Sequence, residues 1–117
     1  MGSSPSRLDK AEVDMKALAI LSYCEKQRHP LRDYLVLMTI KVWQYLVDYC
    51  TTDHVQKITK LTDIQLNDTI QRLMRKGWVA QGGGYLKVTP KGNKEFYSIR
   101  GHISYMINEE FNYKEQK

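Results

Sequence analysis

The chain has 117 residues, of which 42% are hydrophobic and 26% charged, and its net charge at neutral pH is +5. These values fit one globular domain that can bury its own core, so they exclude a wholly disordered chain. The apolar runs are too interrupted by charges to cross a membrane, and the polar start is not that of a signal peptide. We therefore expect a cytoplasmic protein.

The positive charge is concentrated in one part of the chain. Residues 53–100 carry 9 Lys or Arg and 4 Asp or Glu, which accounts for the whole net charge of +5. A localised basic surface is typical of a protein that binds a polyanion. A net charge of +5 is also ordinary for a soluble protein, so charge alone leaves both interpretations open.

The first half of the sequence predicts helices. Residues 1–6 are typical of a disordered tail or a cloning remnant. Arg7–Gln27 has the apolar spacing of a helix, and Pro30 ends it. Leu31–Cys50 has two apolar stripes, which predicts a helix at the centre of the core. Thr39 could cap a new start, so this stretch is one helix or two. One of its stripes comprises Leu35, Met38, Val42, Leu46 and Tyr49.

Two shorter helices follow. Asp53–Lys60 is predicted to be a helix with Val55 and Ile58 facing inward. Thr62 is a good N-cap for the next helix, Asp63–Lys76, and Gly77 is typical of the residue after a helix end. Within this second helix a narrow apolar stripe is predicted to face the core, formed by Leu66, Ile70 and Leu73.

The last third predicts a hairpin and a long helix. Trp78–Gln81 and Tyr85–Thr89 are prone to form strands, and the three glycines between them predict a hairpin tip. Pro90 is tolerated at the first position of a helix that extends to about Phe111. Residues 113–117 form a polar tail. The fold class is therefore mainly α with a small β-hairpin (α+β), in one domain over residues 7–112.

Two segments at the spacing of a hairpin carry a resemblance. LTDIQLNDTIQRLMRKGWV (Leu61–Val79) and VTPKGNKEF (Val88–Phe96) resemble the DNA-binding core of the multiple-antibiotic-resistance-repressor (MarR) type. The resemblance implies a winged helix-turn-helix over 39–89, between an N-terminal helical region (7–38) and a C-terminal helix (90–112) that form a homodimer. The short glycine-tipped wing and the short ends depart from the family, so nothing supports a small-molecule effector.

This fold implies a site for double-stranded DNA. The second helix of such a motif enters the major groove, where its N-terminal residues read base edges. Cations further along the helix and on the wing are expected to contact the phosphate backbone. The predicted base-reading residues are Thr62, Asp63, Gln65, Asn67, Asp68 and Thr69. The predicted backbone contacts are Lys57, Lys60, Arg72, Arg75, Lys76, Lys87 and Lys91. The predicted wing comprises Gln81, Gly82, Gly83, Gly84 and Tyr85.

The flanking helices carry the predicted dimer contacts, because one winged helix covers only a short half-site. The same side chains could instead pack within one subunit. The predicted interface comprises Val13, Leu18, Leu21, Ile103, Met106 and Ile107.

Several functions fit these features. The leading interpretation is a repressor of prokaryotic, viral or plasmid origin that occupies an operator. Alternatives are a protein that binds DNA sites for replication or partition, and a winged helix that binds another protein. A signal-responsive regulator would need a pocket among aromatic side chains, which are more often core. Those aromatic side chains are Trp43, Tyr45, Tyr49, Trp78 and Tyr97.

No enzyme is expected. His29, His54 and His102 are scattered, and no nucleotide-binding glycine motif is present, so the sequence predicts neither a metal nor a cofactor. Cys24 and Cys50 lie in apolar stretches, which predicts buried thiols of a reducing compartment.

Overall fold

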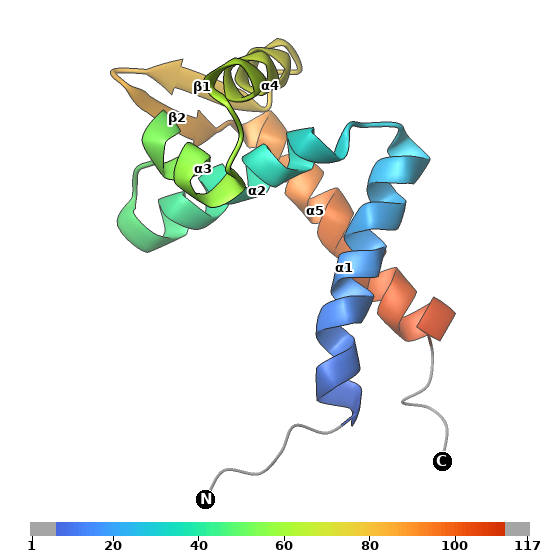
Figure 1. The fold of residues 1–117 in the computed structure, drawn as a ribbon. Coiled ribbons are helices and arrows are strands. Elements are labelled where there is room, and N and C mark those ends of the chain that lie inside the picture. Colours follow the sequence, from blue (N-terminus) through green and yellow to red (C-terminus); the bar gives the residue numbers. More distant parts are fainter. Residues whose placement is uncertain (1–6, 112–117) are drawn as a thin grey trace, which may run out of the picture. The chain divides into compact units, whose positions relative to one another are not determined.

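The computed structural model describes residues 7–111. This part of the chain is mainly helical, with one two-stranded antiparallel sheet, as the sequence predicts (Figure 1). The tails predicted over residues 1–6 and 113–117 lie outside it. The elements in chain order are α1 (Arg7–Gln27), α2 (Leu31–Val47), α3 (Thr52–Thr59), α4 (Asp63–Arg75), β1 (Val79–Gly82), β2 (Tyr85–Val88), α5 (Pro90–Tyr105) and the π-helical turn η1 (Met106–Phe111).

The chain packs into two compact units. The DNA-binding candidate residues all lie in the unit His29–Phe96, which holds α2, α3, α4, the hairpin and the first turns of α5. The other unit holds α1 and the chain from Tyr97 onward. None of the helices in the described residues is long and apolar enough to span a membrane.

The helix α2 runs without a break and buries one side. Thr39 does not start a new helix, because its Oγ1 donates to the carbonyl oxygen of Leu35 within the helix (2.7 Å). The helix ends at Val47, three residues earlier than predicted, and its C-cap Asp48 has a left-handed backbone. The prediction that both apolar stripes are buried is wrong. On one stripe Val36, Ile40 and Cys50 are buried, whereas most of the other is exposed: Leu35, Val42, Leu46 and Tyr49.

The short helix α3 also buries less than predicted. Val55 is fully buried, but Ile58 is 55% exposed, so the prediction that both face inward is wrong for Ile58. The reason is that α3 has only 8 residues and lies on α2 through the side that carries Val55. Ile58 borders the exposed apolar side of α2.

The hairpin has a tighter turn than predicted. Gly82 belongs to β1 and pairs with Tyr85, so the turn consists of Gly83 and Gly84 alone. Both have positive φ (59° and 82°), as a two-residue type I′ turn requires. Leu86 and Val88 alternate into the core along β2, while Tyr85 and Lys87 are exposed.

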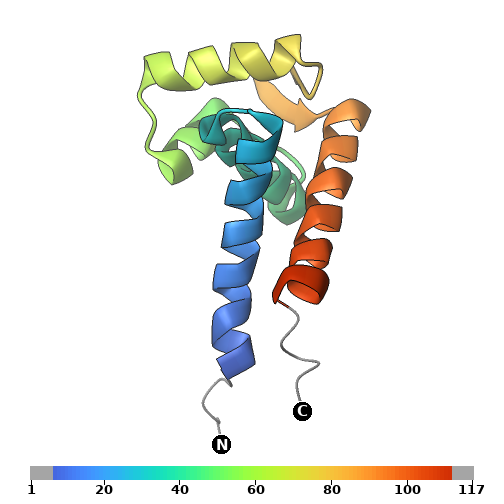
Figure 2. The ribbon, with the colours of Figure 1, turned by 90° about the vertical axis from the view of Figure 1, so that its right-hand side faces the viewer.

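The second unit is built on α1, which packs against η1 (Figure 2). The His102 ring lies 5.4 Å from that of Tyr23, and its Nε2 lies 2.9 Å from the hydroxyl oxygen of Ser22. Cys24 is buried, as predicted. The predicted dimer contacts divide into two sets. Val13, Leu18 and Leu21 on α1 are exposed, whereas Ile103, Met106 and Ile107 are half-buried.

Candidate nucleic-acid interface

Threonine caps fix the start of both α3 and α4. Thr62 Oγ1 accepts a hydrogen bond from the Gln65 backbone N–H (3.1 Å), and Gln65 Oε1 accepts one from the Thr62 N–H (3.0 Å). This reciprocal pair is a capping box. Thr51 caps α3 in the same way, with His54 Nδ1 as the return acceptor. The N-termini of the two helices are therefore well defined.

The connection between α3 and α4 is short and fastened by Gln56. Lys60 ends α3 in the left-handed region. The Gln56 side-chain amide donates to the carbonyl oxygen of Leu61 (3.1 Å) and to Asp63 Oδ1 (2.6 Å). These bonds hold the first turn of α4 against α3.

The helix α4 has one buried side, as the sequence predicts. Leu66, Ile70 and Leu73 are buried. At its C-terminus, the Gly77 N–H donates to the carbonyl oxygen of Met74 and the Trp78 N–H to that of Leu73, each at 3.0 Å. With φ of 79° at Gly77, this is a Schellman motif, which leads the chain directly into β1.

The prediction that Thr69 reads bases is wrong. Thr69 is fully buried, because it lies three residues after Leu66 and four before Leu73, on the core side of α4. Its Oγ1 donates to the carbonyl oxygen of Gln65 (2.8 Å). Gln65 and Thr62 are engaged in the cap, and Asp63 accepts from Gln56, while Asn67 and Asp68 are exposed.

The exposed side of α4 also holds residues that the sequence analysis did not select. Ile64 is 77% exposed, although it is apolar. Gln71 is exposed one turn after Asn67. Their positions off the stripe of Leu66, Ile70 and Leu73 were a usable signal, because a side chain outside that stripe has no core to face.

Two predicted backbone contacts are joined to a buried carboxylate. Asp33 on α2 is fully buried, and its two oxygens accept from Arg72 (2.7 and 3.0 Å) and Lys76 (2.8 Å). Burial by itself would raise the pKa of Asp33. The hydrogen bonds and charges of Arg72 and Lys76 outweigh burial, so this pKa lies below its usual value. Both cations therefore fasten α4 to α2, a role that the sequence analysis missed.

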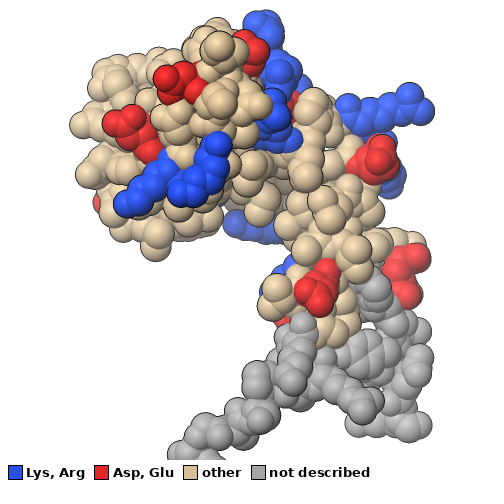
Figure 3. All heavy atoms as spheres, viewed as in Figure 1, with Lys and Arg blue, Asp and Glu red and all other residues tan. Residues whose placement is uncertain are grey.

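The other predicted backbone contacts have exposed side chains, so a polyanion can reach them. Acidic and basic side chains are both present on the face seen in Figure 3, so this surface is mixed rather than uniformly positive. The exposed cations are Lys57, Lys60, Arg75, Lys87 and Lys91.

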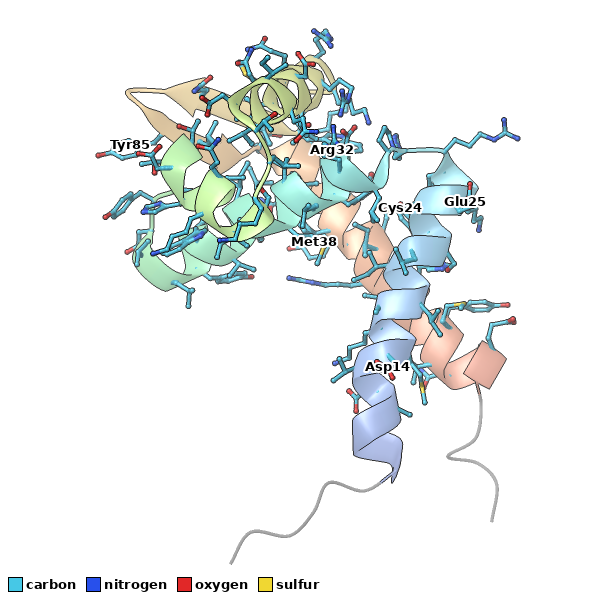
Figure 4. All side chains as sticks on the ribbon, in the orientation of Figure 1. Asp14, Cys24, Glu25, Arg32, Met38 and Tyr85 are labelled. Atoms are coloured by element: carbon cyan, nitrogen blue, oxygen red, sulfur yellow. The ribbon has the colours of Figure 1, made fainter. Side chains whose placement is uncertain are left out.

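The hairpin is anchored to the end of α2. The Leu86 N–H donates to the carbonyl oxygen of Cys50 (2.8 Å), and the Val88 N–H donates to Gln44 Oε1 (2.9 Å). The Tyr85 side chain points outward from the hairpin (Figure 4). The predicted wing is exposed along its whole length, at Gln81, Gly82, Gly83, Gly84 and Tyr85.

A run of aromatic rings joins α2, α3 and β2. The His54 ring stacks on that of Trp43 (centroids 4.3 Å apart), and Tyr49 lies 5.5 Å from both His54 and Tyr85. The five aromatic residues considered for an effector pocket do not gather around one cavity. Trp78 is buried in the core, Trp43 borders the apolar side of α2, and Tyr45, Tyr49 and Tyr97 are exposed.

A polar hollow of about 220 Å³ lies between α3, α4 and β1. Two carboxylates, Asp53 and Asp63, border it. This acidic character at the start of α4 contrasts with the basic end of the helix at Arg75. The hollow is lined by Thr52, Asp53, Gln56, Asp63, Leu66, Asn67, Ile70 and Gln81.

Residues 7–111 contain no candidate metal site, and both of their cysteines are buried. No group of three or more His, Cys, Asp or Glu side chains in this part could hold a metal ion. Burial raises the pKa of Cys50 to about 11, which keeps its thiol protonated and unreactive at neutral pH. Searches against protein-family models, curated proteins and solved structures find no match to this chain.

Proposed function

We propose that the chain is a winged helix-turn-helix protein that binds double-stranded DNA as a homodimer and represses transcription by occupying an operator. The observation that carries this proposal is the exposed polar side of α4, which shares one compact unit with the exposed hairpin. The two capped helices α3 and α4 supply the helix-turn-helix, and the hairpin supplies the wing.

The exposed side chains of α4 suit the major groove. An asparagine amide such as that of Asn67 can pair with adenine through two hydrogen bonds, and Asp68 can accept one from cytosine. Ile64 offers an apolar contact to a thymine methyl group. Because the bases differ most in the major groove, a side chain set of this kind would discriminate between sequences.

Cations around α4 suit the backbone. Arg75 ends the helix, Lys87 lies on β2 and Lys91 in the first turn of α5, and all three are exposed. Such contacts position a protein on the duplex without reading its sequence. Arg72 and Lys76 contribute less in this proposal, because Asp33 already neutralises part of their charge.

The acidic start of α4 favours a second candidate, a winged helix that binds a protein. Asp63 and Asp68 would repel phosphates wherever they do not meet a base donor. A basic surface of another protein would instead be attracted to them. The DNA proposal remains ahead because the polar amides and the exposed cations lie on the same unit.

Fluorescence anisotropy with a random-sequence duplex across a salt series tests the proposal. We expect log affinity to fall linearly with log salt, since phosphate contacts release counterions. Selection of preferred sites from a random pool should then enrich a two-fold symmetric sequence. Absence of binding even at low salt would reject the DNA proposal and favour the protein partner.

A further inference from the structure

The exposed side of α2 is an apolar strip that no other element of the unit His29–Phe96 covers. Leu31, Leu35, Met38 and Val42 follow one another at intervals of four, three and four residues, and Leu46 continues the strip. On a helix with 3.6 residues per turn they occupy a sector of roughly 100°. Met38 lies on the side of α2 opposite α4 (Figure 4).

The strip is hollowed where α3 meets α2. A cavity of about 270 Å³ opens there, and its lining contains no charged side chain. Alternating intervals of three and four are those of a helix that packs against another helix, with side chains of one inserted between those of the other. The lining consists of Leu35, Met38, Thr39, Val42, Trp43, Leu46 and Ile58.

The size of this face matches one side of a dimer interface. Leu31, Leu35, Val42, Leu46 and Ile58 are 41–69% exposed, as is the neighbouring Tyr45. With about 60–120 Å² for an aliphatic side chain and about 150–250 Å² for Tyr45, these six present on the order of 400 Å². The half-buried Met38 and Trp43 add to this area. A stable complex buries about 800 Å² on each partner, of which about 57%, or roughly 450 Å², is apolar. The largest apolar patch of a monomer, about 300–600 Å², is often functional.

We infer that this face binds the same face of a second copy of the chain, with α2 packed against α2 about a two-fold axis. A two-fold interface requires a surface that is complementary to itself. The lining of the cavity carries no charge, so it meets no like-charge repulsion from its own image and offers no charge by which a different partner would be selected. Tyr45 and Met38 also belong to the residue types enriched at interfaces.

This inference specifies the interface of the proposed homodimer. It rests on the proposed function only where it assigns the dimer a role in DNA binding. The face and α4 belong to the same compact unit. A dimer through α2 would therefore hold the two α4 helices at a fixed separation, as two half-sites require. It also moves the main interface away from Val13, Leu18 and Leu21 on α1.

Analytical ultracentrifugation without DNA tests the inference. The full chain should be dimeric at micromolar concentration. Val42→Glu and Leu46→Glu should each weaken the dimer by roughly 100-fold or more, because a dimer would bury two unpaired carboxylates. Leu18→Glu and Leu21→Glu, the matched changes on α1, should leave the dissociation constant within about threefold. Circular dichroism and urea unfolding check that each variant is folded.

A cross-link provides a readout that does not depend on a destabilising charge. Val42→Cys should form an intersubunit disulfide on mild oxidation, and Val13→Cys should not. A chain that stays monomeric, or a dimer broken by Leu18→Glu and kept by Val42→Glu, would overturn the inference. A dimer through α2 that binds no duplex would instead reject the proposed function and leave this interface standing.

Discussion

The helices α2 and α4 pack on each other, yet their outer sides differ in kind. Each buries a stripe of apolar side chains in the same core. The outer side of α4 exposes Asn67, Asp68 and Gln71, whereas the outer side of α2 exposes Leu35, Val42 and Leu46. Burial in the core accounts for the apolar stripes. The outer sides face no core, so their composition needs a functional explanation. A polar outer side suits hydrogen-bonded reading of bases, and an apolar one suits contact with protein.

The largest expected effect is the difference in unfolding free energy between changing a buried leucine of α4 and an exposed leucine of α2. Leu73 on α4 is fully buried and Leu46 on α2 is 69% exposed. Leu73→Ala should lower the free energy of unfolding by about 2–5 kcal/mol, because it leaves a cavity. Leu46→Ala should change it by less than about 0.5 kcal/mol in the monomer. Urea unfolding at a concentration where the chain is monomeric measures both, and equal losses would show that the outer side of α2 is covered within the subunit.

Removal of the carboxylate that joins the two helices should have the next largest effect. Asp33→Asn should cost about 1–3 kcal/mol in unfolding free energy, since the amide has no charge and only one oxygen to accept from Arg72 or Lys76. The cost stays moderate because Arg72 and Lys76 are partly exposed, so water can solvate them. Asp53→Asn, an exposed carboxylate in the same unit, is the control and should cost less than about 1 kcal/mol.

The loss of stability caused by Asp33→Asn should depend on pH. The pKa of Asp33 is lowered in the folded protein. Its stabilising contribution is therefore fully present above the unfolded-state pKa of about 3.9 and is lost as the pH falls through the folded-state pKa. The difference in stability between the natural chain and Asp33→Asn should shrink as the pH is lowered from 7 to below about 4. A constant difference would mean that the carboxylate is not ionised in the fold.

Much of the secondary structure could be predicted because its signals are local. Pro30, Thr62 and Gly77 act through their own backbone or cap, so they mark helix ends without knowledge of the fold. The outer stripe of α2 could not be placed in this way. Leu35 and Val42 have the spacing of a core stripe, and periodicity does not say whether the partner of such a stripe is the same chain or another one.

The candidate site was only partly predictable for a related reason. Asn67 and Asp68 could be predicted to be exposed because they lie off the apolar stripe of α4. The same reasoning would have excluded Thr69, which lies on that stripe. The engagement of Arg72 by Asp33 depends on residues 39 apart in sequence that the fold brings together. A count of cations in sequence therefore overstates the charge available to a ligand.

A smaller effect, confined to particular DNA sequences, should follow from changing the polar side of α4. If Asn67 pairs with a base, Asn67→Ala should weaken binding to the preferred site by about 1–3 kcal/mol and leave binding to random duplex nearly unchanged. Competition anisotropy with both duplexes measures the two affinities. Equal losses on both would place Asn67 on the backbone or outside the interface.

The smallest expected effect compares two exposed cations, one on α4 and one on α1. Arg75 is exposed at the end of α4, while Lys16 is exposed on α1 in the other unit and lies 3.0 Å from Glu12. If Arg75 contacts a phosphate, Arg75→Ala should weaken binding to every duplex and lower the slope of log affinity against log salt by about one. Lys16→Ala carries the same loss of charge and should leave that slope unchanged. A shared decrease in slope would mean that net charge, and not the position of α4 on the duplex, governs the salt dependence.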